Sequence, residues 1–65
     1  MNIQLNGSPL QTGATTLDAL LIEAGFEQAV VATAINGDFI PLGQRADYIL
    51  SDGDRIEVLA PMQGG

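Results

Sequence analysis

One stretch of this chain, residues 15–25, has the spacing of an amphipathic α-helix, and no second stretch of the 65 residues does. Its stripe consists of apolar side chains that recur every three or four residues, widened by one neighbour: Leu17, Leu20, Leu21, Ala24 and Ile22. Thr15 or Thr16 can cap the first turn, and Gly25 suits the C-terminal end. A helix of about ten residues depends on packing more than on propensity. This one helix must therefore cover whatever sheet the rest of the chain forms.

Five further segments have patterns typical of β-strands: residues 2–6, 9–12, 30–35, 39–41 and 55–59. The first and the last alternate apolar and polar side chains, as half-buried strands do. Pro9 favours an edge position for the second segment, because proline cannot donate to a neighbouring strand. Residues 30–35 are nearly continuous in apolar character, which predicts a central strand with both faces covered.

Turn signals separate these segments. Asn6-Gly7 is a strong signal for a tight hairpin, because both residues tolerate positive φ. Asn36-Gly37-Asp38 and the run Ser51–Asp54 also favour turns. Between them, residues 42–47 form a loop or a single helical turn, and residues 48–50 return apolar bulk to the core.

The order of these elements predicts an α+β fold. One main helix packs across one mixed sheet of four to five strands, with the first and last strands side by side in the centre. We expect residues 1–65 to form a single domain with a flexible C-terminal tail, residues 61–65. A hydrophobic content of 46% is enough for a compact core. A domain of this size nevertheless buries only ~60% of its unfolded surface and is marginally stable.

The composition excludes several classes of function. The chain has no cysteine and no histidine, so it lacks thiolate metal ligands and the usual general base, and no cluster of carboxylates resembles a metal site. Eight acidic residues against two arginines give a formal net charge of -6, which argues against binding to nucleic acid. This charge either serves solubility alone or steers the chain toward a basic partner surface. No apolar run is long enough for a membrane span, and the N-terminus does not resemble a signal peptide. We therefore expect a cytoplasmic protein.

The last six residues, Ala60–Gly65, follow directly after the final strand and finish on a glycine pair. Pro61 removes a backbone donor and ends central pairing. Gly64 and Gly65 have no side chains, so this end of the chain has the smallest possible cross-section and can enter a narrow channel in a partner. An extended segment from Pro61 to Gly65 reaches up to ~17 Å. We predict that the Gly65 carboxylate is the reactive group. This carboxylate is ionised at neutral pH and is a poor electrophile, so we expect it to be activated as a mixed anhydride with a nucleotide.

The sequence resembles the ThiS family of sulfur carriers in thiamine biosynthesis. The resemblance rests on Ala34-Ile35-Asn36-Gly37, on Asp52-Gly53-Asp54 and on the terminal Gly64-Gly65, and it extends over the whole chain. It implies a β-grasp, ubiquitin-like fold. One position departs from the family, which commonly carries an arginine where this chain has Leu42 after Pro41. We expect this departure to affect one contact with a partner or at the sheet edge and to leave the terminal chemistry unchanged.

The resemblance also implies a mechanism and a set of partners. A ubiquitin-activating-type adenylyltransferase, similar to ThiF, would adenylate the Gly65 carboxylate with the ATP and Mg²⁺ that it binds itself. Sulfur from a cysteine-desulfurase persulfide would then displace AMP and leave a thiocarboxylate. A thiazole synthase similar to ThiG would take this sulfur into the thiazole ring. The carrier would contribute no catalytic side chain and bind no cofactor.

Two alternatives remain open at this point. The small subunit of molybdopterin synthase has the same fold, tail and thiocarboxylate chemistry. A ubiquitin-like modifier or plain interaction module would form an amide with its tail, or do nothing with it.

A partner-docking surface is expected beside the tail. If Ile56 and Val58 face the helix, the alternation of the final strand turns Leu59 outward. The residues that we expect to contact partners follow this strand and continue into the tail: Leu59, Pro61, Met62 and Gln63. Phe39 and Ile40 either extend this surface or belong to the core.

Overall fold

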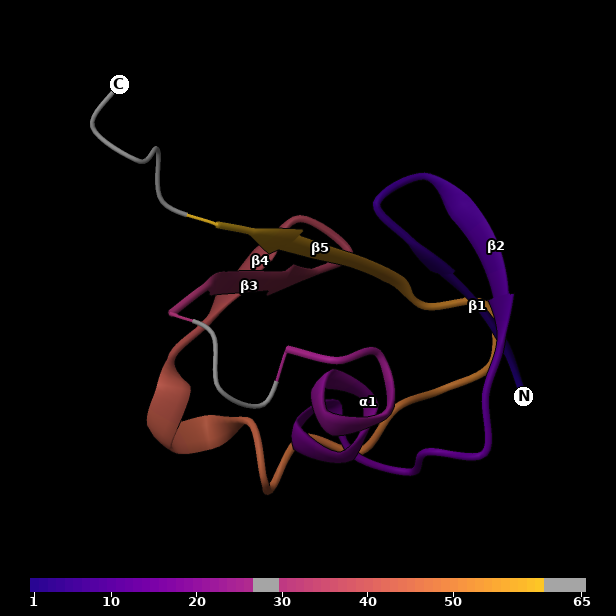
Figure 1. The fold of residues 1–65 in the computed structure, drawn as a ribbon. Helices are drawn as coiled ribbons and strands as arrows, with labels where there is room; N and C mark the ends of the chain where they lie inside the picture. The colour runs from indigo at the N-terminus through magenta and orange to yellow at the C-terminus, as the bar shows by residue number, and fades with distance from the viewer. Residues whose placement is uncertain (27–29, 61–65) are drawn as a thin grey trace.

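The computed structural model describes residues 1–26 and 30–60, and in them one α-helix packs against a five-stranded sheet (Figure 1). The elements follow one another as β1 (Asn2–Leu5), β2 (Ser8–Gln11), α1 (Leu17–Glu23), β3 (Ala32–Ile35), β4 (Asp38–Ile40), a 3₁₀ turn η1 (Leu42–Gln44) and β5 (Arg55–Leu59). This architecture confirms the predicted α+β class and the β-grasp arrangement.

The strands lie in the order β2-β1-β5-β3-β4, so the last strand occupies the centre of the sheet. β1 and β5 run parallel, with Gln4 beside Arg55, and the other neighbouring pairs are antiparallel. β2, which contains Pro9, lies at one edge. The predicted placement of the first and last strands side by side is therefore confirmed.

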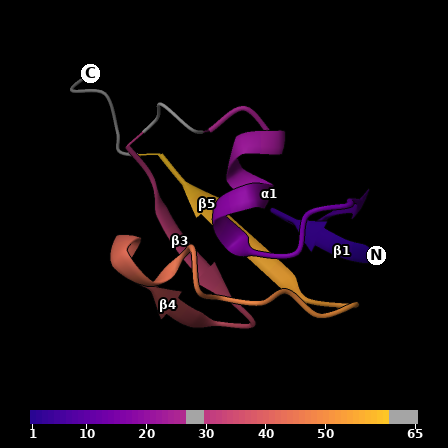
Figure 2. The ribbon, with the colours of Figure 1, turned by 90° about the horizontal axis from the view of Figure 1, so that it is seen from below.

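Helix α1 covers one face of the sheet, as Figure 2 shows from below. Thr16 caps its start by accepting a hydrogen bond from the Ala19 amide at 3.1 Å, and Gly25 follows its end at a φ of 92°. The stripe of Leu17, Leu20 and Leu21 is buried, as predicted. The helix is shorter than expected, at 7 residues.

The predicted widening of the stripe by Ile22 is wrong. Ile22 is 49% exposed, and Ala24 at the C-cap is exposed as well. A helix of two turns presents only a narrow stripe to the sheet, so a residue one position beyond Leu21 already points away from it.

The predicted strand at residues 30–35 does lie inside the sheet rather than at its edge, but the prediction that both of its faces are covered is wrong. β3 lies between β5 and β4, and only its Thr33 and Ile35 are buried. Ala32 is exposed and Ala34 is partly exposed on the other face. Alanine contributes to an apolar pattern, yet it has little surface to bury, so the uninterrupted run came from small residues on an open face.

A buried arginine connects the loop before β5 to β3. The side chain of Arg45 is 7% exposed, and its guanidinium donates to Thr33 Oγ1 at 3.0 Å and to the Val31 carbonyl at 2.6 Å. Leu50 brings its side chain into the core, as predicted for residues 48–50, whereas Ile49 is exposed. Within residues 1–26 and 30–60, no helix has the length and apolar character that a membrane crossing requires.

Candidate functional site

The central strand β5 leads directly to the tail and has two different faces. Ile56 and Val58 are buried under α1, whereas Arg55, Glu57 and Leu59 are exposed on the opposite face. The exposed fraction of Leu59 is 63%. The prediction that Leu59 faces outward is therefore confirmed.

Neighbouring strands continue this open face. Ala32 of β3 lies opposite Leu59, and Ala34 lies between Glu57 of β5 and Phe39 of β4. The two alanines have small side chains, so the surface of β3 is low on this face. The larger apolar side chains of Leu59 on β5 and Phe39 on β4 are exposed on either side of it. Leu59, Ala32 and Ala60 also line an apolar hollow together with Val30 and Val31.

The structure separates the residues predicted to contact partners. Phe39 is 67% exposed on the open face, which agrees with an extension of the Leu59 surface. Ile40 belongs to the core at 6% exposed, so its placement in a docking surface is wrong. Adjacent strand residues point to opposite faces, so only one of this pair can reach the open side. The tail residues Pro61, Met62, Gln63, Gly64 and Gly65 lie outside the described residues.

Two asparagine side chains, which the sequence analysis assigned only to turns, hold β5 in place. Asn6 accepts a hydrogen bond from the Val58 amide at 2.8 Å and donates to the Val58 carbonyl at 3.2 Å. Asn36 accepts from the Arg55 amide at 3.0 Å and donates to Asp54 Oδ1 at 3.0 Å. Both residues have positive φ, of 50° and 53°, which asparagine tolerates better than most residues. The strand that carries Leu59 is thus fixed by side chains near both of its ends.

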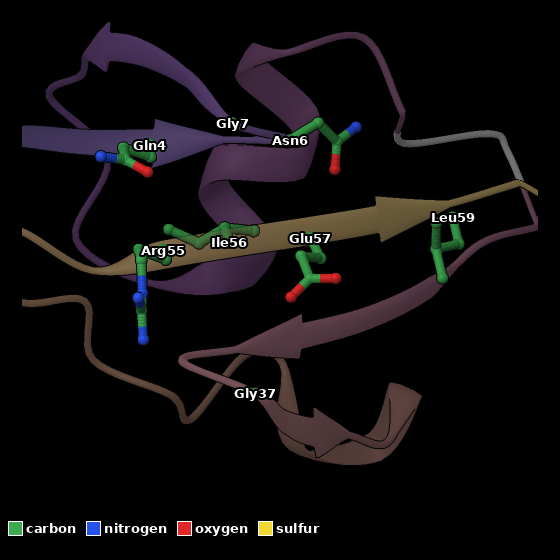
Figure 3. Close-up of a pocket in the computed structure, with 8 residues that line it drawn as sticks. All are labelled: Gln4, Asn6, Gly7, Gly37, Arg55, Ile56, Glu57 and Leu59. Carbon is green, nitrogen blue, oxygen red and sulfur yellow. The ribbon is translucent and has the colours of Figure 1, made fainter.

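A shallow hollow crosses the open face between the two Asn-Gly turns (Figure 3). Gln4, Arg55 and Glu57 line it, with Gly7 and Gly37 on either side. In the described part of the chain, no group of three or more potential metal-ligating side chains converges on one point. The chain also has no cysteine or histidine. The arrangement therefore offers a polar and apolar contact surface, and the one reactive group predicted from sequence is the carboxylate of Gly65.

Comparison with known proteins gives the family. The model of the ThiS family matches residues 3–65. The chain belongs to the ThiS family. A ThiS protein of Geobacter metallireducens, solved by crystallography and described as a thiamine biosynthesis protein, has 32% sequence identity and a TM-score of 0.85, with 100% of both chains covered.

Two kinds of curated relative match this ThiS chain. The sulfur carrier protein ThiS of Thermus thermophilus is 40% identical over 63 residues, which is 97% of this chain and 98% of that protein. The thiazole synthase of Paramagnetospirillum magneticum is 33% identical over 66 residues, which is 100% of this chain and 20% of that protein. The chain thus spans about a fifth of the length of the thiazole synthase and nearly the whole length of the carrier.

Proposed function

We propose that this chain is a sulfur carrier protein of thiamine biosynthesis, a protein cosubstrate on which other enzymes act. The observation that supports this most is the match to ThiS carriers along the whole chain, up to the glycine pair at residues 64 and 65. The names of the relatives and of the solved neighbour belong to thiamine and thiazole formation, which favours this pathway over molybdopterin synthesis.

The chemistry takes place at Gly65. A carboxylate oxygen of Gly65 attacks the α-phosphorus of ATP on an adenylating enzyme of the ubiquitin-activating type, and pyrophosphate leaves. A persulfide sulfur supplied by a cysteine desulfurase then attacks the acyl carbon and expels AMP. A second thiol of the sulfur relay cleaves the sulfur–sulfur bond, becomes part of a disulfide and releases the thiocarboxylate. The partner enzyme, and not this chain, binds the ATP and Mg²⁺ that the reaction uses.

The body of the domain contributes recognition. Leu59 and Phe39 give the open face its apolar contacts, and Leu59 lies at the end of β5, immediately before Ala60 and the tail. An enzyme that binds this face receives the tail beside its own active site. The partner that consumes the sulfur is a thiazole synthase, because proteins of that name carry a region similar to this whole chain.

A reconstituted reaction tests the proposal. The chain is incubated with the adenylating enzyme, the cysteine desulfurase, L-cysteine as the sulfur source, a thiol, ATP and Mg²⁺, and its intact mass is measured before and after. We expect the mass to rise by one exchange of oxygen for sulfur. A variant that lacks Gly65, and another with one residue added after it, should show no change, because the carboxylate is then displaced from the site of adenylation.

Both variants should keep the melting temperature of the parent, since the core lies within the described residues that precede the tail. Conversion of the truncated chain to a thiocarboxylate would show that the reactive group is not the Gly65 carboxylate.

A further inference from the structure

The open face of the sheet differs in charge from the rest of the chain. Its strand positions include one cation, Arg55, and one anion, Glu57. Among the described residues, no other acidic side chain occupies a strand position on this face. Asp38 pairs with the buried Ile35 and so belongs to the helix side of β4. These strand positions therefore carry no net charge, whereas the whole chain has a formal charge of -6.

The two charges of the open face have a fixed order and spacing. Arg55 and Glu57 are two residues apart on β5 and project from the same side of the strand (Figure 3), which separates their Cα atoms by about 7 Å. Asn36 holds the backbone of Arg55, and Asn6 holds that of Val58 just beyond Glu57. Going along β5 toward the tail, a partner therefore meets a positive charge, a negative charge and then the apolar Leu59.

Such an order favours one orientation of a bound partner. The diffuse negative charge of the other surfaces attracts any basic protein, but it does not fix the orientation in which that protein binds. On the open face, a correctly turned partner places a carboxylate opposite Arg55 and a cation opposite Glu57. The same partner turned end to end brings like charges together, which costs affinity and suppresses the wrong complex.

We propose that Arg55 and Glu57 set the orientation in which a thiazole synthase docks on the open face, so that the tail after Leu59 points into its active site. This inference rests on the proposed function. A thiazole synthase is the occupant favoured by the comparisons, because two proteins of that name include a region that matches this chain over its full length. Its docking surface should present an acidic and a basic side chain at matching spacing, next to an apolar one that contacts Leu59 and Ala32.

Two double variants separate orientation from simple attraction. The variant R55E/E57R exchanges the two charges, and R55Q/E57Q removes both. Each keeps the net charge at the wild-type value, and each keeps Leu59 and the buried residues of β5. The thiazole synthase of the same organism is titrated with wild type and with both variants at low and at high salt. Thermal melts of all three proteins check that the fold is intact.

We expect wild type to bind best, R55Q/E57Q to bind less tightly, and R55E/E57R to bind weakest, at least about tenfold below wild type at low salt. The differences in affinity among the three proteins should become smaller at high salt, because exposed charges are screened. Equal binding by all three proteins would overturn the inference, and so would equal binding by the two variants, since the order of the charges would then not matter.

Failure of this inference can be distinguished from failure of the proposed function. If wild type forms the thiocarboxylate but does not bind the thiazole synthase, the docking inference is overturned and the carrier function stands. If wild type neither forms the thiocarboxylate nor binds, the proposed function is overturned and the inference falls with it.

Discussion

The two faces of β5 differ in burial, although alternating residues of the same five-residue strand form both of them. On the helix side, Ile56 and Val58 are almost fully buried at 1% and 5% exposed. On the open side, Leu59 remains exposed next to two charged residues. In the described residues one α-helix covers the sheet, so one face supplies the core and the other stays exposed, where we propose that partners bind.

We expect this difference to separate stability from recognition within a few residues. A substitution on the covered face should change the free energy of unfolding, and a substitution on the open face should change the free energy of binding. The asparagines that hold β5 belong to neither face, since they bond its backbone. The following predictions test how cleanly the two properties separate, beginning with the largest effect.

Ile56→Ala should produce the largest loss of stability. Ile56 lies in the centre of the sheet beneath α1, and truncating such a side chain leaves a cavity that costs about 2–5 kcal/mol. Chemical denaturation measures the loss, with Glu57→Ala as the control on the exposed face, where we expect a change within about 0.5 kcal/mol. Equal losses from the two variants would mean that the faces of β5 are not distinct.

Leu59→Asp should weaken binding to a partner and leave the stability of the fold unchanged. We expect its binding to the adenylating enzyme to weaken by roughly 1–3 kcal/mol, as for a central contact residue, with an unchanged melting temperature. Ile49→Asp is the matched control. Ile49 is also an exposed apolar residue, but it pairs with Thr16 at the start of α1 and not with a strand of the open face, so its substitution should leave binding unchanged. Binding titrations that gave the same affinity for Leu59→Asp as for wild type would place the interface elsewhere.

Phe39→Ser tests how far the open face extends and should have the smallest effect. Phe39 lies at the edge strand β4, so we expect a binding loss below about 1 kcal/mol. Its stability should change by no more than about 0.5 kcal/mol, because the side chain is exposed. Ile40→Ser is the companion variant and should destabilise the fold strongly, since Ile40 is in the core. A large loss of stability from Phe39→Ser would contradict the assignment of Phe39 to the open face.

The sequence predicted those parts of the fold that depend on local pattern. The alternation around Ile56 and Val58 gave the strand and both of its faces, and the Asn6-Gly7 turn gave the first hairpin. The same pattern turned Leu59 outward. Each of these follows from the period of a strand or from the backbone freedom of a turn, which a short stretch of sequence contains.

Other features depend on tertiary placement and could not be predicted in this way. The run at residues 30–35 did not reveal that Ala32 and Ala34 lie on an uncovered face, because alanine suits either environment. Nothing in the pattern indicated that Arg45 would be buried against Thr33, or that the Asn6 side chain would bond Val58. These contacts join residues far apart in the chain, and they exist only once the sheet has formed.

The proposed sulfur-carrier function depends most on the Gly65 thiocarboxylate, and the intact mass of the chain isolated from its own cells tests this directly. Cells deprived of thiamine should contain a fraction of the chain that is heavier by one exchange of oxygen for sulfur. Fragmentation should locate the added mass at Gly65. A chain that is entirely unmodified under these conditions, or one joined through an amide bond to other proteins, would contradict the sulfur-carrier function.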